Sequence, residues 1–492
     1  MSHAASSNLP SAPTIRPWPA LWAMVIGFFM ILVDSTIVSV ATPDIQQELE
    51  TTYTIVIWVT SAYLLAYAVP LLITGRLGDR FGPKNIYLIG LALFTVSSLW
   101  CGLTGSIETL IAARVVQGFG ASMMTPQTMA VITRTFAANE RGKAMALWGA
   151  TAGVATLVGP VLGGVLTEHA GWEWIFFINV PVGVVGFVLA WRLVPSLETH
   201  THRFDLLGVA LSAAAMFLVV FGIQEGEEYD WGQITGVLSV PLLIGLGLVT
   251  FGLFFWWQLV NQNEPLLPLQ VFRDRSFSVS NVAIACVSFA ITGMAFPFML
   301  WAQIVRGMSP TESGLLFVPM AVMSVVMAPI VGRYTDTTSP RLLASIGFAI
   351  SAAVMLVLHL SVDVDTPIWI VLLALGGFGL GNSFLWAPLA ATATRKLPPQ
   401  LAGAGSGVYN AVRQVGAVMG SAAIAAAISA RLAAHLPGVN AQGAARSATE
   451  SLPPEVAERF AAAMTDTLWV PFGAFVVGFV VVQLFATRDS DA

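Results

Sequence analysis

The decapeptide GRLGDRFGPK (Gly75–Lys84) returns later in the chain as GRYTDTTSPR (Gly332–Arg341). The two copies keep a glycine, an arginine, an aspartate, a proline and a final cation at equivalent positions. Each copy follows a long apolar run, so both charged segments are expected in loops after a helix. A duplicated loop in a chain with few charges indicates two related halves that run in parallel.

The composition is that of a membrane protein. Charged residues make up 10% of the 492 residues and hydrophobic residues 56%, whereas soluble domains carry about 25% charged residues. Apolar runs of about 20 residues recur along the chain, which is the length that a helix needs to cross a bilayer. The sequence therefore predicts an all-α polytopic membrane protein.

Fourteen membrane spans are expected. They cover 19–41, 54–74, 85–104, 109–131, 144–166, 174–191, 206–223, 236–261, 278–300, 313–331, 342–361, 367–393, 404–430 and 467–487. The duplicated loops follow spans 2 and 10, whereas two adjacent six-helix halves would place them six spans apart. Two helices, most simply spans 7 and 8, are therefore inserted between the halves, which gives a 6 + 2 + 6 arrangement.

This arrangement divides the chain into five parts. They are an N-terminal tail (1–18), a six-helix bundle (19–200), an inserted helix pair (201–265), a second six-helix bundle (266–487) and a C-terminal tail (488–492). The longest loop, 431–466, is expected on the outer side. Its segment PPEVAERFAAAM is expected to form an amphipathic helix that lies on the surface.

Lys and Arg orient the chain, because cytoplasmic loops carry an excess of these residues. With the N-terminus in the cytoplasm, most of the 22 cations fall on the cytoplasmic side. The outer side then holds Arg306, Arg431, Arg446 and Arg459. Both termini are therefore predicted to be cytoplasmic. The net charge of −5 comes from acidic outer loops, so it gives no reason to expect a nucleic-acid partner.

Three charged residues lie deep in the apolar spans: Asp34, Arg114 and Arg413. A charge at the bilayer centre costs roughly 2.5–3.5 kcal/mol on insertion scales, so each needs a partner or a function. Asp34 and Arg114 lie at similar depth, roughly 9–12 Å below the outer boundary at 1.5 Å per residue, and can pair. Gln117 lies one turn from Arg114 and is expected to join them.

Two roles are open for this pair. It is either a fixed ion pair or a carboxylate whose proton occupancy changes as the protein opens to each side. Burial raises the pKa of an aspartate and a nearby arginine lowers it, so a movement that alters either effect moves a proton. We favour the second role, because a buried ion pair contributes little net stability. Arg413, beside Gln414, has no embedded acid, and both a structural role and contact with an anionic substrate group stay open.

Other residues are expected to pack helices or to line a cavity. The segment VGPVLGG (158–164) on span 5 contains four candidate packing residues: Gly159, Pro160, Gly163 and Gly164. Glycines spaced by four allow another backbone to approach closely. The Met-rich segment TGMAFPFMLW suits adaptable recognition of apolar ligands, although ordinary packing also explains it. The candidate cavity-lining residues are Tyr63, Met294, Phe296, Phe298, Met299, Asn382, Trp386 and Asn410.

These motifs resemble those of the major facilitator superfamily, and in particular its fourteen-span drug:H⁺ antiporters of the EmrB/QacA type. GRLGDRFGPK resembles the family's motif in the loop between spans 2 and 3. LIAARVVQGFGAS (Leu110–Ser122) resembles the span 4 motif with its buried arginine. ATLVGPVLGG (Ala155–Gly164) is similar to the span 5 antiporter motif, with Ala155 where glycine is usual.

Three further motifs extend the resemblance over nearly the whole chain. They are LVDSTIVSVATPDI (Leu32–Ile45), WEWIFFINVPVG (Trp172–Gly183) and GSGVYNAVRQVGAVMG (Gly405–Gly420). Glu173 stands where the family usually has arginine, which reverses a loop charge.

The resemblance implies a major facilitator fold in which two six-helix bundles rock about a central cavity. It implies proton coupling by Asp34 and Arg114, supported by a polar network, and a seam closed by the glycines and proline of span 5. The supporting polar residues are Gln117, Arg413 and Gln414.

The resemblance also implies that the duplicated loop is a cytoplasmic latch. Asp79 is expected at the N-terminus of a helix of the second half, which we take to be span 13. The helix dipole favours a carboxylate there by roughly 0.3–1 kcal/mol. The latch residues are Gly75, Asp79, Arg80, Gly82, Lys84 and, in a weaker second copy, Asp336. A plain charged turn is the alternative.

We therefore expect a proton-coupled antiporter that exports amphipathic organic compounds or drugs across the plasma membrane. No cofactor other than the proton gradient, no metal and a monomeric state are expected. An exporter of an endogenous lipid, siderophore or metabolite and a proton-independent uniporter or channel are the alternatives. An enzyme is not expected, since none of the six His residues pairs with an acid inside a span.

Overall fold

A computed structural model describes residues 16–51, 53–137, 140–199, 205–226, 229, 231–261, 265–267, 269–436 and 453–485. Within these ranges the chain is helical, apart from a short antiparallel hairpin of β1 (Gln233–Thr235) and β2 (Leu238–Ser239). The predicted C-terminal tail and most of the predicted N-terminal tail lie outside the described residues.

The N-terminal half contains eight helices. They are α1 (Pro17–Glu48), α2 (Tyr53–Ala68), α3 (Leu71–Phe81), α4 (Pro83–Leu103), α5 (Ile107–Thr135), α6 (Arg141–Ala170), α7 (Trp174–Phe177) and α8 (Asn179–Leu193). Local sequence explains their starts. The Ser106 hydroxyl accepts a hydrogen bond from the Thr109 N–H and caps α5. Pro83 opens α4, where a missing N–H costs no hydrogen bond.

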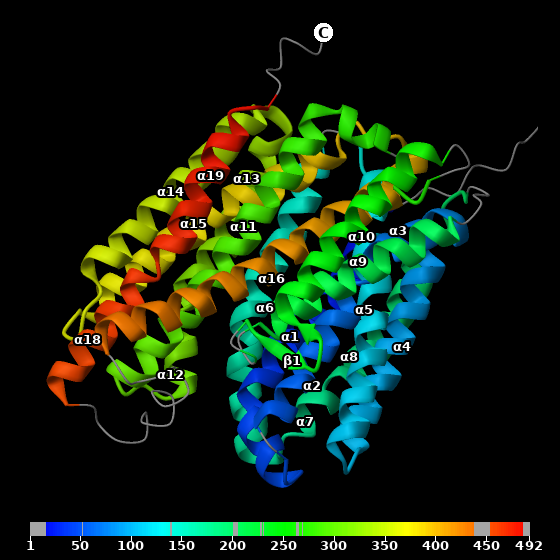
Figure 1. The fold of residues 1–492 in the computed structure, drawn as a ribbon. Coiled ribbons are helices and arrows are strands. Elements are labelled where there is room, and N and C mark those ends of the chain that lie inside the picture. Colours follow the sequence, from blue (N-terminus) through cyan, green and yellow to red (C-terminus); the bar gives the residue numbers. More distant parts are fainter. Residues whose placement is uncertain are drawn as a thin grey trace, which may run out of the picture.

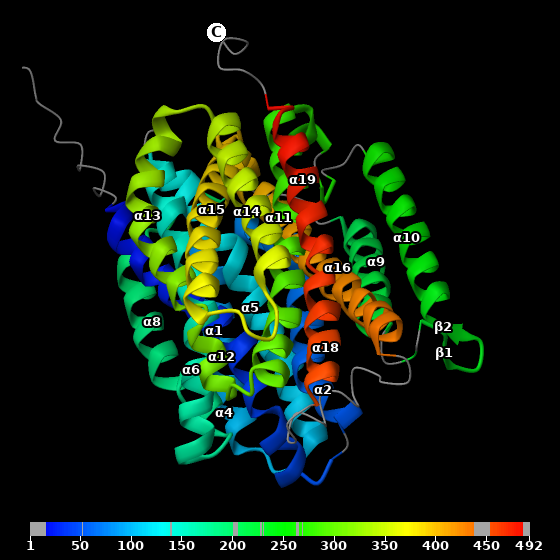
Figure 2. The same cartoon turned by 90° about the vertical axis from the view of Figure 1, so that its left-hand side faces the viewer.

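Two helices follow at the edge of the molecule, α9 (Leu206–Gln224) and α10 (Val240–Val260). They pack against each other, and α9 also contacts α2 and α16 (Figure 2). This pair corresponds to the predicted insertion.

The C-terminal half begins with the 3₁₀ turn η1 (Leu269–Arg273) and the long helix α11 (Arg275–Leu300), which runs into the π-helix η2 (Trp301–Val305). The remaining elements are α12 (Pro310–Leu315), α13 (Val318–Thr337), α14 (Pro340–Ser361), α15 (Ile368–Thr394), η3 (Pro399–Leu401), α16 (Ala402–His435), α18 (Pro454–Asp466) and α19 (Trp469–Val482).

Twelve helical segments in the described part of the chain are long and apolar enough to cross a membrane. A bent pair, Trp58–Ala68 and Leu71–Phe81, makes a thirteenth if it counts as one span. The predicted span 2 is therefore not one straight helix but bends by 47°. The break falls at Pro70, since proline lacks the N–H and clashes with the preceding turn. The predicted span 4 corresponds to the helix α5, which is not among these candidate spans, so the described residues support up to thirteen spans and not the predicted fourteen.

The predicted outer loop 431–466 begins too early, because the helix α16 continues to His435. The helix predicted within the loop is present as α18, which begins at Pro454 and ends at Asp466. The helix α18 is amphipathic, with Glu455 and Glu458 on its exposed face. It buries Phe460 and Met464 against neighbours that include α16, and it continues toward α19 as one candidate span, Pro454–Val482.

The two halves meet through close helix contacts of α3 with α16 and of α6 with α13 and α15. From this end of the molecule the two groups of helices diverge toward the end that holds α7 and α18 (Figure 1). Two glycines permit the closest approaches. A Cβ on Gly75 would lie 2.5 Å from the carbonyl oxygen of Gly403, and one on Gly332 would lie 2.9 Å from Lys143 Cα. Gly75 and Gly332 are the equivalent glycines of the duplicated motif.

Candidate functional site

Asp34 of α1 and Arg114 of α5 form an ion pair inside the N-terminal half. The Arg114 Nη1 donates to Asp34 Oδ2 at 2.5 Å, and both side chains are fully buried. The predicted pairing of these two embedded charges is therefore confirmed in the geometry.

Two amides share the same carboxylate. Gln117 Nε2 and Asn179 Nδ2 donate to Asp34 Oδ1 at 3.0 and 2.9 Å. Both amides also donate to Ser98 Oγ, at 3.2 and 3.0 Å, while the Ser98 hydroxyl donates to the Phe176 carbonyl. Asp34 is thus held by α5 and α8, with Ser98 of α4 beneath the two amides.

Arg114 is oriented by three other contacts. Its Nε donates to the Val59 carbonyl at 3.0 Å, and its Nη1 also donates to Gln117 Oε1 at 2.7 Å. Its guanidinium carbon lies 4.1 Å from the centre of the Tyr63 ring, a cation–π contact. Its buried Nη2 has no hydrogen-bond partner among the described residues.

This network suits an ionised Asp34, because every group that faces the carboxylate is a donor. Separation of the ion pair would leave the buried guanidinium without its counter-charge, which is costly in an apolar interior.

Sequence reasoning missed Asn179 and Ser98. Asn179 lies within the motif WEWIFFINVPVG, and an amide in an apolar span was a signal that it has a polar partner. Ser98 carried no such signal, because a serine in a membrane helix satisfies itself by bonding to its own backbone.

Asp79 of α3 binds the start of α16 in the opposite half. Its Oδ1 accepts from the Gly403 N–H and its Oδ2 from the Ala404 N–H, both at 2.9 Å. The helix α16 is the predicted span 13. Asp79 is 1% exposed, so this carboxylate caps the helix in a dry interface.

Asp336 of α13 makes the reciprocal contact. Its Oδ1 accepts from the Gly142 N–H in the first turn of α6, at 2.8 Å, and the Lys143 N–H faces the same carboxylate. Each copy of the motif therefore places its aspartate on a helix start in the other half. Asp336 is less buried than Asp79, which agrees with the expected weaker second copy.

The other predicted latch residues lie around Asp79. Gly82 has a φ of +88°, which favours glycine, and it ends α3 before α4 begins. Arg80 lies 5.3 Å over the ring of Phe81, and Lys84 lies in the first turn of α4.

Arg76 is a further residue of this motif, and the sequence predicted no role for it. Its Nε donates to the Leu266 carbonyl at 2.8 Å and its Nη2 to the Pro265 carbonyl at 2.5 Å. It ties α3 to the segment that leaves α10. Its presence in both copies of the motif, as Arg76 and Arg333, was the available signal.

Arg413 is not part of the Asp34 network, which corrects the prediction that it supports that site. Its Nη2 donates to the Tyr67 hydroxyl at 3.1 Å, and Tyr67 lies 3.1 Å from Thr125 Oγ1. Its guanidinium carbon lies 5.9 Å from the Trp386 ring. Arg413 thus links α16 to α2 between the halves. Gln414 beside it is buried.

The candidate cavity-lining residues fall into different environments. Asn382 and Trp386 border a cavity of about 10 Å³ between α6, α13 and α15. Tyr63 packs under Arg114, and Asn410 donates to the Ser406 carbonyl. Phe296 is 53% exposed on α11, and its place in a cavity stays a prediction. The other three residues of α11 are buried or partly buried in its packing: Met294, Phe298 and Met299.

The glycine seam of α6 packs mainly within the N-terminal half. Side chains at Gly159 and Gly163 would clash with Thr36 and Ile37 of α1. Gly164 instead faces α12, where an added Cβ would lie 3.1 Å from Thr311 Oγ1. Pro160 lies close to Gly314 of α12. The seam therefore joins α6 to α1 and touches the opposite half at one end.

The family model of the Major Facilitator Superfamily matches residues 24–421. The chain belongs to the major facilitator superfamily. It is 53% identical over 475 residues to an uncharacterised MFS-type transporter of Mycobacterium tuberculosis, over 96% of this chain and 81% of that protein. It is 34% identical over 460 residues to the tetracenomycin C resistance and export protein of Streptomyces glaucescens, over 92% of this chain and 82% of that protein.

A solved proton:xylose symporter of the superfamily has the same fold, with a TM-score of 0.67, 13% identity and 96% coverage of both chains. This major facilitator protein is therefore a transporter rather than an enzyme, and a multi-pass protein of the plasma membrane. Among the described residues, no three His, Cys, Asp or Glu are grouped to hold a metal ion.

Proposed function

We propose that this transporter is a proton-coupled antiporter that exports amphipathic organic compounds, with Asp34 as the group that carries the proton. The observation that supports this most is the fully buried Asp34 network, in which one carboxylate receives donors from Arg114, Gln117 and Asn179. A buried charge with so many partners adds little stability compared with apolar packing, so a functional role explains it better.

The proton and the movement of the halves are coupled through α1 and α6. Asp34 lies on α1, and α1 packs against the glycine face of α6 at Gly159 and Gly163. The start of α6 is held by Asp336 of the opposite half through Gly142. When protonation releases Arg114, α1 moves, and the displacement reaches the inter-half contact through α6.

The latches define the state of the transporter. Asp79 and Asp336 join the halves at the end where α4, α6 and α16 begin. With fourteen spans in a 6 + 2 + 6 order and both termini in the cytoplasm, this end is cytoplasmic. The described conformation is then closed to the cytoplasm, and both latches break when the transporter opens inward.

The substrate class is supported by the relatives. The Streptomyces glaucescens protein is named for tetracenomycin C resistance and export, which favours organic compounds of drug size. Between the halves, Trp386 and Arg413 offer an aromatic face and a cation to such a compound. We propose that a single chain performs the cycle, since the whole network lies within one half.

Transport into inverted proteoliposomes tests this function. A panel of dyes, antibiotics and lysolipids is offered with and without an imposed pH gradient, and a protonophore is added as the control. Antiport predicts accumulation against the substrate gradient that collapses when the protonophore is added. Uptake that only equilibrates the substrate and ignores the pH gradient would show a uniporter instead.

A further inference from the structure

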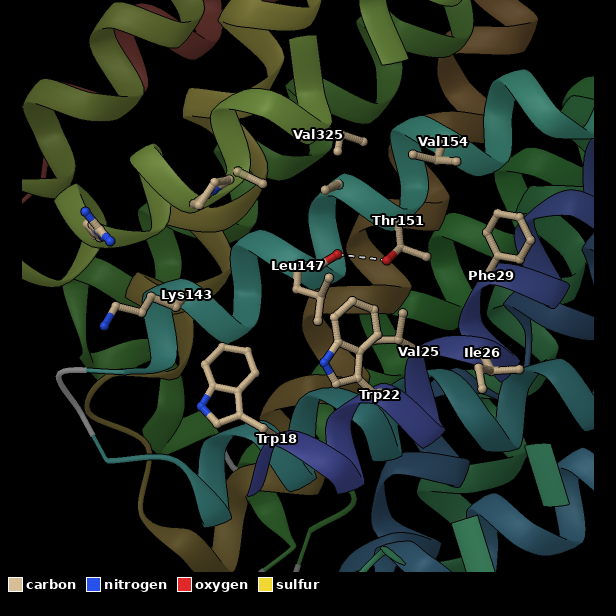
Figure 3. Close-up of a pocket in the computed structure, with 14 residues that line it drawn as sticks. Trp18, Trp22, Val25, Ile26, Phe29, Lys143, Leu147, Thr151, Val154 and Val325 are labelled. Atoms are coloured by element: carbon tan, nitrogen blue, oxygen red, sulfur yellow. Dashed lines mark hydrogen bonds between the residues drawn. The ribbon is translucent and has the colours of Figure 1, made fainter. Parts of the chain in front are cut away.

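A groove of about 640 Å³ lies between α1, α6 and α13, apart from the Asp34 network. Figure 3 shows its walls. The helices α1 and α6 belong to the N-terminal half and α13 to the C-terminal half, so the groove crosses the boundary between the halves. It is lined at helical spacing by Trp18, Trp22, Val25, Ile26 and Phe29 of α1, by Lys143, Leu147, Ala150, Thr151 and Val154 of α6, and by Val325, Ala328, Pro329 and Arg333 of α13.

One end of the groove is cationic. Lys143 lies in the first turn of α6 and Trp18 in the first turn of α1, and Figure 3 shows both at the same end. Arg333 is one turn before Asp336, whose carboxylate binds the start of α6, so Arg333 reaches this end too. Asp336 offsets part of the charge of Lys143, whereas the exposed Arg333 side chain adds a second positive charge.

The rest of the groove is apolar and open to one side. Phe29 and Val154 lie at the end away from Lys143 (Figure 3). Phe29 lies eleven positions after Trp18, which is roughly 16 Å of helix at 1.5 Å per residue. At the rim, Trp22 is 55% exposed and Val325 47% exposed. Both lie on helices that are candidate membrane spans, which fits an open side that faces lipid.

We propose that this groove binds one anionic phospholipid of the bilayer leaflet on the side of the latches. The phosphate lies against Arg333 and Lys143 beside Trp18, and an acyl chain follows the apolar wall toward Phe29 and Val154. Charge complementarity selects an anionic head over a zwitterionic one, since each basic residue near an anionic membrane contributes about fivefold in affinity. The bound lipid contacts both halves and favours the conformation in which the latches are joined.

Native mass spectrometry of the purified full chain tests the site. Phosphatidylglycerol and phosphatidylcholine with identical acyl chains are titrated separately, and the affinity of the first bound lipid is measured. We expect phosphatidylglycerol to bind at least fivefold more tightly. Arg333→Gln is expected to weaken phosphatidylglycerol binding about fivefold. The double variant Arg333→Gln with Lys143→Gln is expected to weaken it further. Arg192→Gln, which removes an exposed cation at the end of α8, is the matched control and leaves binding unchanged.

A second pair of variants tests the groove itself. Ala328→Phe fills the apolar part without changing charge and is expected to abolish tight binding. If Ala328→Phe does not fold, Val325→Trp at the exposed rim is used in its place. Val249→Trp, on the exposed face of α10, is the control. Inorganic phosphate is added as a competitor and should not displace the lipid.

The charge variants and the groove-filling variants together test whether the groove is a lipid site. Loss of binding in both the charge and the filling variants supports the site. Loss in the charge variants alone would mean ordinary attraction to a basic surface, and would overturn the proposal. Equal binding of both lipids, or displacement by inorganic phosphate, would also overturn it. The readout is lipid binding, so it is independent of proton-coupled transport.

Discussion

The carboxylate of Asp336 in the C-terminal half accepts a hydrogen bond from the backbone N–H of Gly142 in the N-terminal half, at 2.8 Å. Asp79 makes the same kind of contact in the other direction, with the first turn of α16. The duplicated motif thus yields two pseudo-symmetric caps. Each cap uses the positive end of a helix of the opposite half, which is a favourable place for a carboxylate.

Removing either cap should favour the inward-open state. Asp79→Asn and Asp336→Asn each replace an acceptor oxygen with an NH₂ group that faces backbone donors. We expect the free-energy difference between the latched and the inward-open state to shift by about 1–2 kcal/mol toward the inward-open state. The shift should be larger for the more buried Asp79. Electron spin resonance distances between labels at residues 85 and 342 measure the opening. Asp274→Asn, which removes the charge of an N-cap of α11 that lies within one half, is the control. Unchanged distances in both latch variants would contradict this role.

Close packing at the first latch should be as important as its charge. Gly75→Ala puts a Cβ where only 2.5 Å separates it from the Gly403 carbonyl oxygen, so α3 and α16 must move apart. We expect slower transport and a longer distance between the same labels. Gly473→Ala is the matched control, because nothing lies within 4 Å of the added Cβ. Normal transport by Gly75→Ala would show that the helices separate without cost.

The apolar runs predicted the helical class, the embedded charges predicted the pairing of Asp34 with Arg114, and the family resemblance predicted the helix that Asp79 contacts. The pairing could be predicted because a charge in an apolar span has few places to find a partner. The sequence did not predict the bend at Pro70, because proline is tolerated in many straight membrane helices.

The exposure of Phe296 and the partners of Arg413 also escaped prediction. Both depend on how each helix is rotated about its axis, and a helix that is apolar on every face gives no periodic signal for this. The groove along α1, α6 and α13 depends on three helices that are distant in sequence, so only the structure brings its residues together.

The guanidinium geometry of Arg114 should matter beyond its charge. Arg114→Lys keeps the positive charge, but its three N–H donors radiate from one nitrogen and cannot reproduce the fixed fork by which Nε binds Val59 while Nη1 binds Asp34 and Gln117. We expect the initial rate of proton-driven transport to fall at least about tenfold, which is a loss of about 1.4 kcal/mol in transition-state stabilisation. Arg306→Lys is the control, because this arginine donates to the carbonyls of Val364 and Thr366, lies over the Trp301 ring and has no part in the Asp34 network. Equal transport rates for Arg114→Lys and the parent would mean that a positive charge at this position is enough for transport.

Asp205 should stabilise the junction between the inserted pair and the C-terminal half. Burial raises its pKa, but hydrogen bonds from Trp257, Gly208, Gln258 and Leu266 lower it more, so its pKa lies below the ordinary 3.8. The folded pKa is depressed, so this stabilisation is complete above the unfolded pKa and is lost only as the pH falls through the lower folded value.

We therefore expect Asp205→Asn to lower the free energy of unfolding by about 1–3 kcal/mol. The difference in melting temperature from the parent should stay constant between about pH 5.5 and 8, where Asp205 is ionised in both the folded and the unfolded state. Differential scanning fluorimetry across this range measures it. A difference that shrinks toward the acidic end would mean that Asp205 titrates in this window and is not held in its charged form.

Proton release on substrate binding tests the role of Asp34 most directly. Substrate is added to purified protein in weakly buffered solution that contains a pH-sensitive dye, and the parent is compared with Asp34→Asn. Glu108→Gln, which removes an exposed carboxylate from the same helix as Arg114, is the control. We predict proton release from the parent and from Glu108→Gln, and none from folded Asp34→Asn that still binds substrate. Release from Asp34→Asn equal to that of the parent would contradict the assignment of the coupling proton to Asp34.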